Sequence, residues 1–153
     1  MRNKLRFASL LALASLTACT NGGTPTSTGG GGGLTITVNL TLNQPQPTPY
    51  GSSAGYAPPV TTVAVGSQIR FTNTDSFTHT ATLIPGATQF PSGSPFGASA
   101  LQQKGTTLSG SFTSGALLAG SSSQSITADR AGTYYFGCFF HYGAGMRGVI
   151  VAQ

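Results

Sequence analysis

Residues 134–146 have the sequence YYFGCFFHYGAGM. Cys138, His141 and Met146 stand within nine residues of one another, in a connection between two predicted strands. A thiolate, an imidazole and a thioether are together the ligands that soft, redox-active copper prefers. Zinc seldom binds methionine, and the domain lacks the further cysteine or histidine that a structural zinc site needs. The stretch therefore predicts a copper site in a loop between strands.

A fourth ligand has to come from outside this loop. The chain has two histidines, and the other one, His79, ends the segment FTNTDSFTH at residues 71–79. It stands at the mouth of another predicted strand. The second cysteine, Cys19, belongs to the amino-terminal region. The candidate ligands are therefore His79, Cys138, His141 and Met146.

Alternation of apolar and polar residues identifies the first strand, at residues 34–42, where Leu, Ile and Val alternate with Thr and Asn. Residues 43–59 are rich in proline and predict an irregular crossing loop. No segment has sustained helical periodicity, although residues 98–103 are compatible with a turn or two. Short strands separated by Gly, Pro and Ser turns predict an all-β fold, an antiparallel β-sandwich. The further strands are expected at 61–65, 68–73, 78–84, 124–128, 133–137 and 148–152.

The amino-terminal region has the pattern of an export signal. Three basic residues fall within the first six, and residues 7–18 are apolar or small, a stretch too short to span a bilayer. Residues 16–19 (LTAC) resemble the bacterial lipobox, in which the cysteine is acylated and becomes the mature amino terminus. We predict a lipoprotein signal peptide at residues 1–18 and lipidation of Cys19. Ordinary cleavage that releases a soluble protein is the alternative.

The rest of the chain divides into two parts. Residues 19–33 comprise Cys19 and a Gly/Ser/Thr-rich tether whose composition favours a flexible coil. Residues 34–153 contain the predicted strands and form the copper-binding domain. This organisation predicts an exported protein that is lipid-anchored on the periplasmic or extracytoplasmic side of a membrane.

Charge is scarce, and its scarcity excludes several functions. Only 9 residues are charged, and Asp75 and Asp129 are the only acidic ones, so a pair of catalytic carboxylates has almost no source. Without the three basic residues of the signal, the net charge is +2, which argues against a nucleic-acid-binding surface. A multicopper oxidase is excluded because no histidine remains for further copper ions.

The sequence resembles a cupredoxin, most closely plastocyanin and its relatives. The spacing Cys-x2-His-x4-Met with Gly-Ala-Gly before the Met matches the plastocyanin ligand loop, and residues 131–136 and 147–151 match its flanking strands. Residues 71–79, with the pattern F-x-N-x5-H, match the first-ligand segment. The resemblance implies a Greek-key β-sandwich and one type 1 copper ion.

The resemblance also implies a role for each residue at a matching position. The copper ion would lie in a plane formed by His79, Cys138 and His141, with Met146 as the weak axial ligand. Asn73 and Thr80 would support the ligands from outside the coordination sphere. An apolar patch around His141 would contact partner proteins, and it would consist of Phe139, Phe140, Tyr142 and Ala144.

The chain departs from the family pattern at three places. Thr80 stands where relatives often have an Asn that ties the two ligand segments together, and Phe140 replaces a common proline. The 58 residues between His79 and Cys138 exceed the plastocyanin count, and we assign the excess to residues 85–110. That insertion is either a docking loop or a surface insertion without a role.

Taken together, these features predict an electron carrier rather than an enzyme. Its donor and acceptor would be redox proteins associated with the membrane. Two alternatives remain open: a lipoprotein that binds or delivers copper, and a metal-free adhesive β-sandwich. Cys138 and His141 could also form a nucleophilic pair, but no acidic residue stands nearby in the sequence to orient the histidine.

Overall fold

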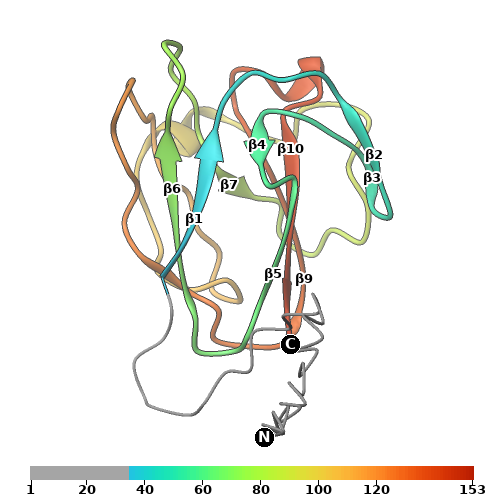
Figure 1. Ribbon diagram of the computed structural model, residues 1–153, viewed down its shortest axis with the longest axis vertical. Coiled ribbons are helices and arrows are strands. Elements are labelled where there is room, and N and C mark those ends of the chain that lie inside the picture. Colours follow the sequence, from blue (N-terminus) through green and yellow to red (C-terminus); the bar gives the residue numbers. More distant parts are fainter. Residues whose placement is uncertain (1–34) are drawn as a thin grey trace, which may run out of the picture. The chain divides into compact units, whose positions relative to one another are not determined.

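The structure, a computed structural model, describes residues 35–153. Two four-stranded sheets lie face to face, and a two-stranded hairpin flanks them (Figure 1). The strands are β1 (Thr35–Leu40), β2 (Gln46–Thr48), β3 (Gly51–Ser53), β4 (Tyr56–Ala57), β5 (Val60–Val63), β6 (Gln68–Asn73), β7 (Thr82–Leu83), β8 (Ile126–Thr127), β9 (Gly132–Gly137) and β10 (Arg147–Ala152). Two short 3-10 turns complete the fold, η1 (Ala98–Leu101) and η2 (Tyr142–Ala144).

The first sheet has the strand order β4-β1-β6-β8, and the second has the order β5-β10-β9-β7. Strands β1 and β6 are parallel neighbours, in a register that places Val38 beside Phe71. Parallel neighbours need a crossover connection, and here the chain passes through β5 of the second sheet before it returns as β6. This crossing links the two layers.

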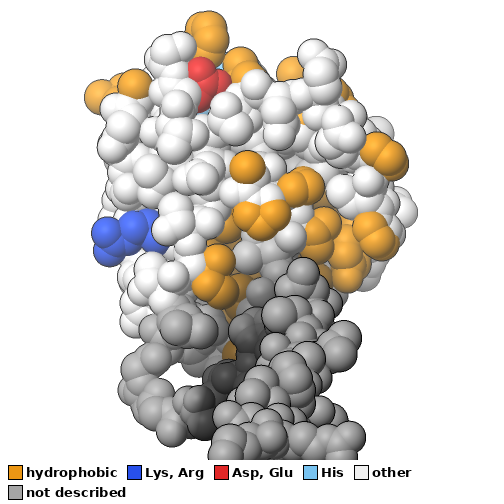
Figure 2. Space-filling view, in the orientation of Figure 1, with side chains coloured by type: hydrophobic (Ala, Val, Ile, Leu, Met, Phe, Trp, Pro, Cys, Tyr) orange, Lys and Arg blue, Asp and Glu red, His pale blue; other side chains and the backbone are white. Residues whose placement is uncertain are grey.

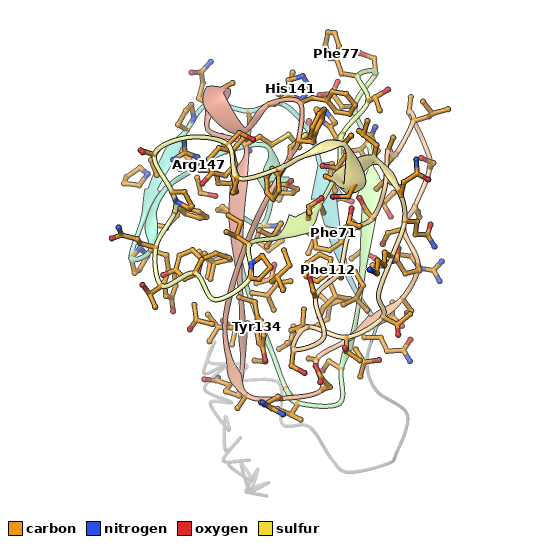
Figure 3. All side chains as sticks on the ribbon, turned by 180° about the vertical axis from the view of Figure 1, so that it is seen from behind. Phe71, Phe77, Phe112, Tyr134, His141 and Arg147 are labelled. Carbon is orange, nitrogen blue, oxygen red and sulfur yellow. The ribbon has the colours of Figure 1, made fainter. Side chains whose placement is uncertain are left out.

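The core lies between the layers and is built from residues that alternate along the strands. Val38 and Leu40 of β1 are buried while Thr37 and Asn39 are exposed, the pattern of a strand with one face toward a core. Aromatic rings fill the centre. The ring of Phe71 lies 5.7 Å from that of Phe112, and both residues are labelled in Figure 3. The ring of Phe71 also lies 5.2 Å from that of Phe136. Such ring pairs contribute roughly 0.5–1.5 kcal/mol each beyond area burial.

The β-sandwich expected from the sequence is confirmed, and several details differ. The pairs β1–β6 and β5–β10 are parallel, whereas the other pairs within the two sheets are antiparallel. The proline-rich residues 43–59, expected to be an irregular loop, contain β2, β3 and β4. Of the strand expected at 78–84, only Thr82–Leu83 is regular, because the backbone of His79 pairs with Leu117 instead.

Within residues 85–110, the predicted insertion, the part that contains Phe90 and Phe96 packs against the outer face of the second sheet, whereas Leu108 is buried in the main core. Phe90 contacts the ring of Tyr135 edge-on, at a centroid distance of 5.0 Å, and Phe96 contacts Tyr142 in the same way at 5.5 Å. The hydroxyl of Tyr142 donates a hydrogen bond to the carbonyl oxygen of Pro91 at 2.9 Å. The insertion therefore covers a second, smaller hydrophobic cluster that reaches the loop between β9 and β10.

The predicted signal peptide (1–18) and tether (19–33) lie outside the described residues, and the same holds for the predicted lipidation site, Cys19. Among residues 35–153, no helix is long and apolar enough to cross a membrane.

Candidate metal centre

Cys138, His141 and Met146 come from the connection between β9 and β10. The backbone N–H of Cys138 donates to the carbonyl of Met146 at 3.1 Å, and the N–H of Met146 donates to the carbonyl of His141, also at 3.1 Å. Gly145 has a φ of +89°, a left-handed conformation that glycine adopts without a steric cost. The loop thus closes on itself by local hydrogen bonds.

His79 comes from the segment between β6 and β7, and its side chain is fully buried. The backbone N–H of His79 donates to the carbonyl of Leu117 at 3.1 Å, and the N–H of Leu117 donates to the carbonyl of His79 at 2.8 Å. Asn73 holds the start of the same segment. Its side-chain amide donates to the carbonyls of Phe77 and Leu117, at 2.7 and 2.8 Å.

The fold brings the side chains of His79, Cys138 and His141 together. The Sγ atom of Cys138 lies 3.9 Å from Nδ1 of His79 and 3.6 Å from Nδ1 of His141. The two Nδ1 atoms are 3.1 Å apart. One thiol and two imidazoles therefore present their ligand atoms to a common point, all within 4.8 Å of one another.

This donor set fits copper. A buried sulfur and two imidazole nitrogens converge, and no carboxylate oxygen takes part in the group. Soft sulfur and borderline nitrogen ligands select copper over hard cations such as Mg²⁺ or Ca²⁺. Burial first, and the neighbouring His79 second, lower the pKa of His141 below its ordinary value. The imidazole of His141 therefore stays neutral near pH 7, the state in which it can bind a metal.

Met146, the predicted axial ligand, is buried in the same core cluster as Cys138. Gly55 packs directly against it. A Cβ at Gly55 would lie 2.3 Å from Cγ and 3.0 Å from Sδ of Met146, so only glycine fits there. The position of the thioether is therefore defined by the chain that leads into β4.

Thr80 ties the two ligand segments together, although relatives often use Asn there. Its hydroxyl accepts a hydrogen bond from the backbone N–H of Phe139 at 2.8 Å, and its own N–H points at the sulfur of Cys138 at 3.4 Å. Its carbonyl accepts a hydrogen bond from the hydroxyl of Tyr56 at 2.6 Å. Hydrogen bonds to a ligating sulfur hold the ligand and tune its metal.

Asp75 was not among the predicted site residues, but its Oδ2 lies 3.2 Å from Nε2 of His79. The spacing of four residues to a histidine was visible in the sequence, but the contact depends on how the loop folds. The backbone N–H of Leu42 donates to the same oxygen at 2.8 Å. These hydrogen bonds, that of Leu42 foremost, lower the pKa of Asp75 to about 2, so the side chain is a carboxylate at neutral pH.

The surface beside the site is apolar, but its composition differs from the prediction. Tyr142 is only 1% exposed, because the insertion covers one edge of its ring and the guanidinium of Arg147 lies 4.3 Å above it. Its assignment to a contact patch was wrong. Phe140 is 45% exposed, as expected, and Phe139 is half-buried. Two residues not predicted, Phe77 and Leu118, are 57% and 66% exposed.

These apolar side chains stand next to the ligand segments, because Phe140 precedes His141 in the chain and Leu118 follows Leu117, whose backbone pairs with that of His79. Phe77 and His141 lie at the same end, opposite Tyr134 (Figure 3). In the space-filling view, hydrophobic side chains protrude at this end, and the Lys and Arg side chains that are visible lie away from it (Figure 2). We call Phe77, Leu118 and Phe140 the apolar rim.

Several solved structures are similar to this chain. They include a purple cupredoxin from Nitrosopumilus maritimus, with 19% identity over 76% of this chain and 98% of that one, at a TM-score of 0.49. A plastocyanin from Dryopteris crassirhizoma has 22% identity over 77% of this chain and 100% of that one, also at 0.49. An oxidised amicyanin mutant has 17% identity over 78% and 82%, again at 0.49.

No curated protein matches the chain. A family model does match, over residues 49–153, and it describes copper binding proteins of the plastocyanin/azurin family. The match covers more than half of the chain and includes His79, Cys138, His141 and Met146. Together with the converging ligand atoms of the site, it shows that this chain belongs to the plastocyanin/azurin family of copper-binding proteins, the cupredoxins.

Proposed function

We propose that this blue copper electron-transfer protein would hold a single type 1 copper ion with His79, Cys138, His141 and Met146. We further propose that it exchanges electrons with membrane-associated redox proteins on the periplasmic or extracytoplasmic side. When bound, copper supplies the one-electron couple between Cu(II) and Cu(I). The observation that carries the proposal is the convergence of one buried sulfur and two Nδ1 atoms within 4.8 Å.

The chain's own residues keep the ligands in place through a redox change. The hydroxyl of Thr80 joins the His79 segment to the backbone at Phe139. The backbone bonds between Cys138 and Met146 close the other ligand segment. Because both segments are tied to the sandwich and to each other, little structural rearrangement accompanies electron transfer. The burial of His79 and Cys138 excludes water from the sulfur.

Electrons would enter and leave through His141, which is half-buried and stands beside the exposed ring of Phe140. The apolar rim offers a partner a surface from which water is easily displaced. A redox protein with a complementary apolar face fits this surface better than a charged one, because few charged side chains stand on this domain. Small, weak contacts of this kind are typical of electron-transfer complexes.

The metal site is tested with the purified protein and Cu(II). We expect an intense blue colour that ascorbate bleaches, and a Cys138→Ser variant that binds copper without this colour. A Cys138→Ser variant that stays blue would refute the assignment of the sulfur ligand. A wild-type protein that stays pale would instead favour copper delivery or a metal-free adhesive role.

The role of the apolar rim is tested by electron self-exchange between oxidised and reduced copies of the protein, measured by NMR line broadening. Leu118→Lys and Phe140→Lys should each slow self-exchange by tenfold or more, because two like charges then meet at the contact. The matched control is Val65→Lys. Val65 is 48% exposed, and its backbone pairs with Gln153 at the other end of the sandwich. Equal slowing in the control would contradict a contact at the rim.

The proposed location is supported by the basic and apolar pattern of residues 1–18 and by the lipobox-like residues 16–19. Expression with a clickable fatty acid tests it. We expect label in the wild-type chain and none in a Cys19→Ala variant, which should leave the membrane fraction. An unlabelled wild-type chain would favour release as a soluble protein, and label in the variant would mean that Cys19 is not the acylated residue.

A further inference from the structure

Asp75 stands four residues before His79, and its carboxylate lies against the imidazole. The distance from Asp75 Oδ2 to His79 Nε2 is 3.2 Å, within the range of a hydrogen bond. The same oxygen accepts the N–H of Leu42 at 2.8 Å. The other oxygen, Oδ1, accepts the backbone N–H of Ser76 at 2.6 Å and lies 3.4 Å from its hydroxyl. The carboxylate is therefore held on both of its oxygens.

The backbone of Asp75 is fixed as well. Its N–H donates to the side-chain oxygen of Asn73 at 2.9 Å, and Asn73 is itself fully buried. Asn73 in turn holds the carbonyl of Leu117, which accepts the N–H of His79. The histidine and its acidic neighbour thus belong to one hydrogen-bonded unit.

The contact determines which nitrogen of His79 is available to a metal. An ionised carboxylate only accepts hydrogen bonds, so the neutral imidazole must carry its proton on Nε2 to bond with it. The lone pair is then on Nδ1, the atom that lies 3.9 Å from the sulfur of Cys138 and 3.1 Å from Nδ1 of His141. A carboxylate on the far nitrogen also makes a ligating imidazole more basic.

We propose that Asp75 is a positioning residue for His79: its carboxylate holds the Nε2 proton, turns the Nδ1 lone pair toward Cys138, and by its charge favours Cu(II) over Cu(I). The divalent ion gains more from a nearby negative charge than the monovalent ion does. The inference rests on the copper electron-transfer function proposed above, and it adds a residue that sets the reduction potential.

The chain offers a matched control, because its only other acidic residue is Asp129. Asp129 bonds to Ser109 and lies in the chain between β8 and β9, outside the ligand segments. Asp75→Asn and Asp129→Asn remove the same charge and conserve shape. In Asp75→Asn the amide oxygen can take the place of Oδ2 and accept the Nε2 hydrogen bond, while the amide nitrogen replaces Oδ1 and loses the bond from the N–H of Ser76. The variant therefore removes the charge and keeps the hydrogen bond to His79.

The first experiment measures Cu(II) and Cu(I) affinities by titration and the reduction potential by voltammetry. For Asp75→Asn we expect Cu(II) affinity to fall about tenfold with Cu(I) affinity nearly unchanged, the lower end of the effect of such outer contacts. A tenfold fall in the ratio of Cu(II) affinity to Cu(I) affinity raises the reduction potential by about 59 mV. Asp129→Asn should have the wild-type potential. Equal potentials in all three proteins, each with an intact blue spectrum, would overturn the inference.

The second experiment uses only the wild-type protein, so its outcome does not depend on whether a variant folds. Nitrogen-15 NMR of the metal-free and Cu(I) forms of the wild-type protein reports the tautomer of His79. We expect a proton on Nε2 that exchanges slowly with water in both forms. A proton on Nδ1 in the metal-free form would overturn the inference. If the wild-type protein never becomes blue, the proposed function fails, whichever nitrogen of His79 carries the proton. The failure of the inference and the failure of the proposed function are therefore distinguishable.

Discussion

Two segments deliver the ligands, and they are held in different ways. The loop 138–146 closes on itself, through hydrogen bonds between Cys138, His141 and Met146 that span only a few residues. The segment 73–80 is held by distant parts of the chain, namely Leu42 through Asp75 and Leu117 through His79. The difference teaches that the backbone shape of the loop 138–146 is closed by local hydrogen bonds, with Gly55 and Thr80 as contacts from outside, whereas the segment 73–80 takes its shape only once the sandwich has formed.

The largest expected effect tests whether the loop 138–146 depends on its contact with Gly55, in addition to its own hydrogen bonds. Gly55→Ala places a Cβ 2.3 Å from Cγ of Met146, at a φ of +75°. Overpacking and left-handed strain together should lower the free energy of unfolding by about 2–5 kcal/mol. Urea unfolding of the metal-free protein measures this, and the spectrum of the copper form reports the displacement of Met146.

The matched control for this change is Gly86→Ala. Gly86 has a φ of +67° but has no atom within 4 Å of the added Cβ. It should lose only about 1–2 kcal/mol, from backbone strain alone. Equal losses in the two variants would mean that contact with Gly55 does not position Met146.

The second largest expected effect concerns the stability of the segment 73–80, which is held by distant parts of the chain. Asn73→Ala removes hydrogen bonds to the carbonyls of Phe77 and Leu117 and to the N–H of Asp75. Unpaired buried groups cost roughly 1–3 kcal/mol each, so we expect the free energy of unfolding to fall by about 2–4 kcal/mol. Copper affinity should fall as well, because His79 loses its support.

Asn39→Ala is the control for this prediction, since Asn39 lies on the exposed face of β1. Surface substitutions of this kind usually change stability by no more than about 0.5 kcal/mol. If Asn73→Ala unfolds at the same urea concentration as Asn39→Ala, then Asn73 does not hold the first-ligand segment.

The same difference explains what could be predicted from the sequence. The strand pattern, the Cys-x2-His-x4-Met spacing and the F-x-N-x5-H pattern that ends at His79 can each be read in a short stretch of sequence, so the sandwich and the ligand residues Cys138, His141 and His79 were predictable. The contact of Asp75 with His79 and the role of Thr80 as the tie to Phe139 depend on tertiary folding. For the same reason Tyr142 was misjudged: an aromatic residue beside His141 gives no sign that residues 85–110 will cover it.

The third and smaller expected effect concerns the hydrogen bond between Tyr142 and the insertion at residues 85–110. Tyr142→Phe removes the hydrogen bond from the hydroxyl of Tyr142 to the carbonyl of Pro91. It should lower the free energy of unfolding by about 1 kcal/mol, the usual net value for such a bond. Tyr134→Phe removes the more exposed hydroxyl that bonds to Arg130 and should change little. Equal effects would show that the insertion does not clamp the ligand loop through Pro91.

The smallest expected effect is the pH dependence of stability that comes from Asp129, a residue outside both ligand segments. Hydrogen bonds from the hydroxyl and the N–H of Ser109 lower the pKa of Asp129, so its folded pKa lies below its unfolded value of about 3.9. The stability that Asp129 contributes is therefore complete above that value and is lost as the pH falls through the folded pKa. Urea midpoints of the metal-free protein between pH 6 and pH 2 should fall more steeply in the wild type than in Asp129→Asn.

The copper spectrum of Asp129→Asn at pH 7 should match the wild type, because Ser109 and Asp129 support neither ligand segment. A changed spectrum would mean that the copper centre depends on chain outside the two segments that deliver its ligands.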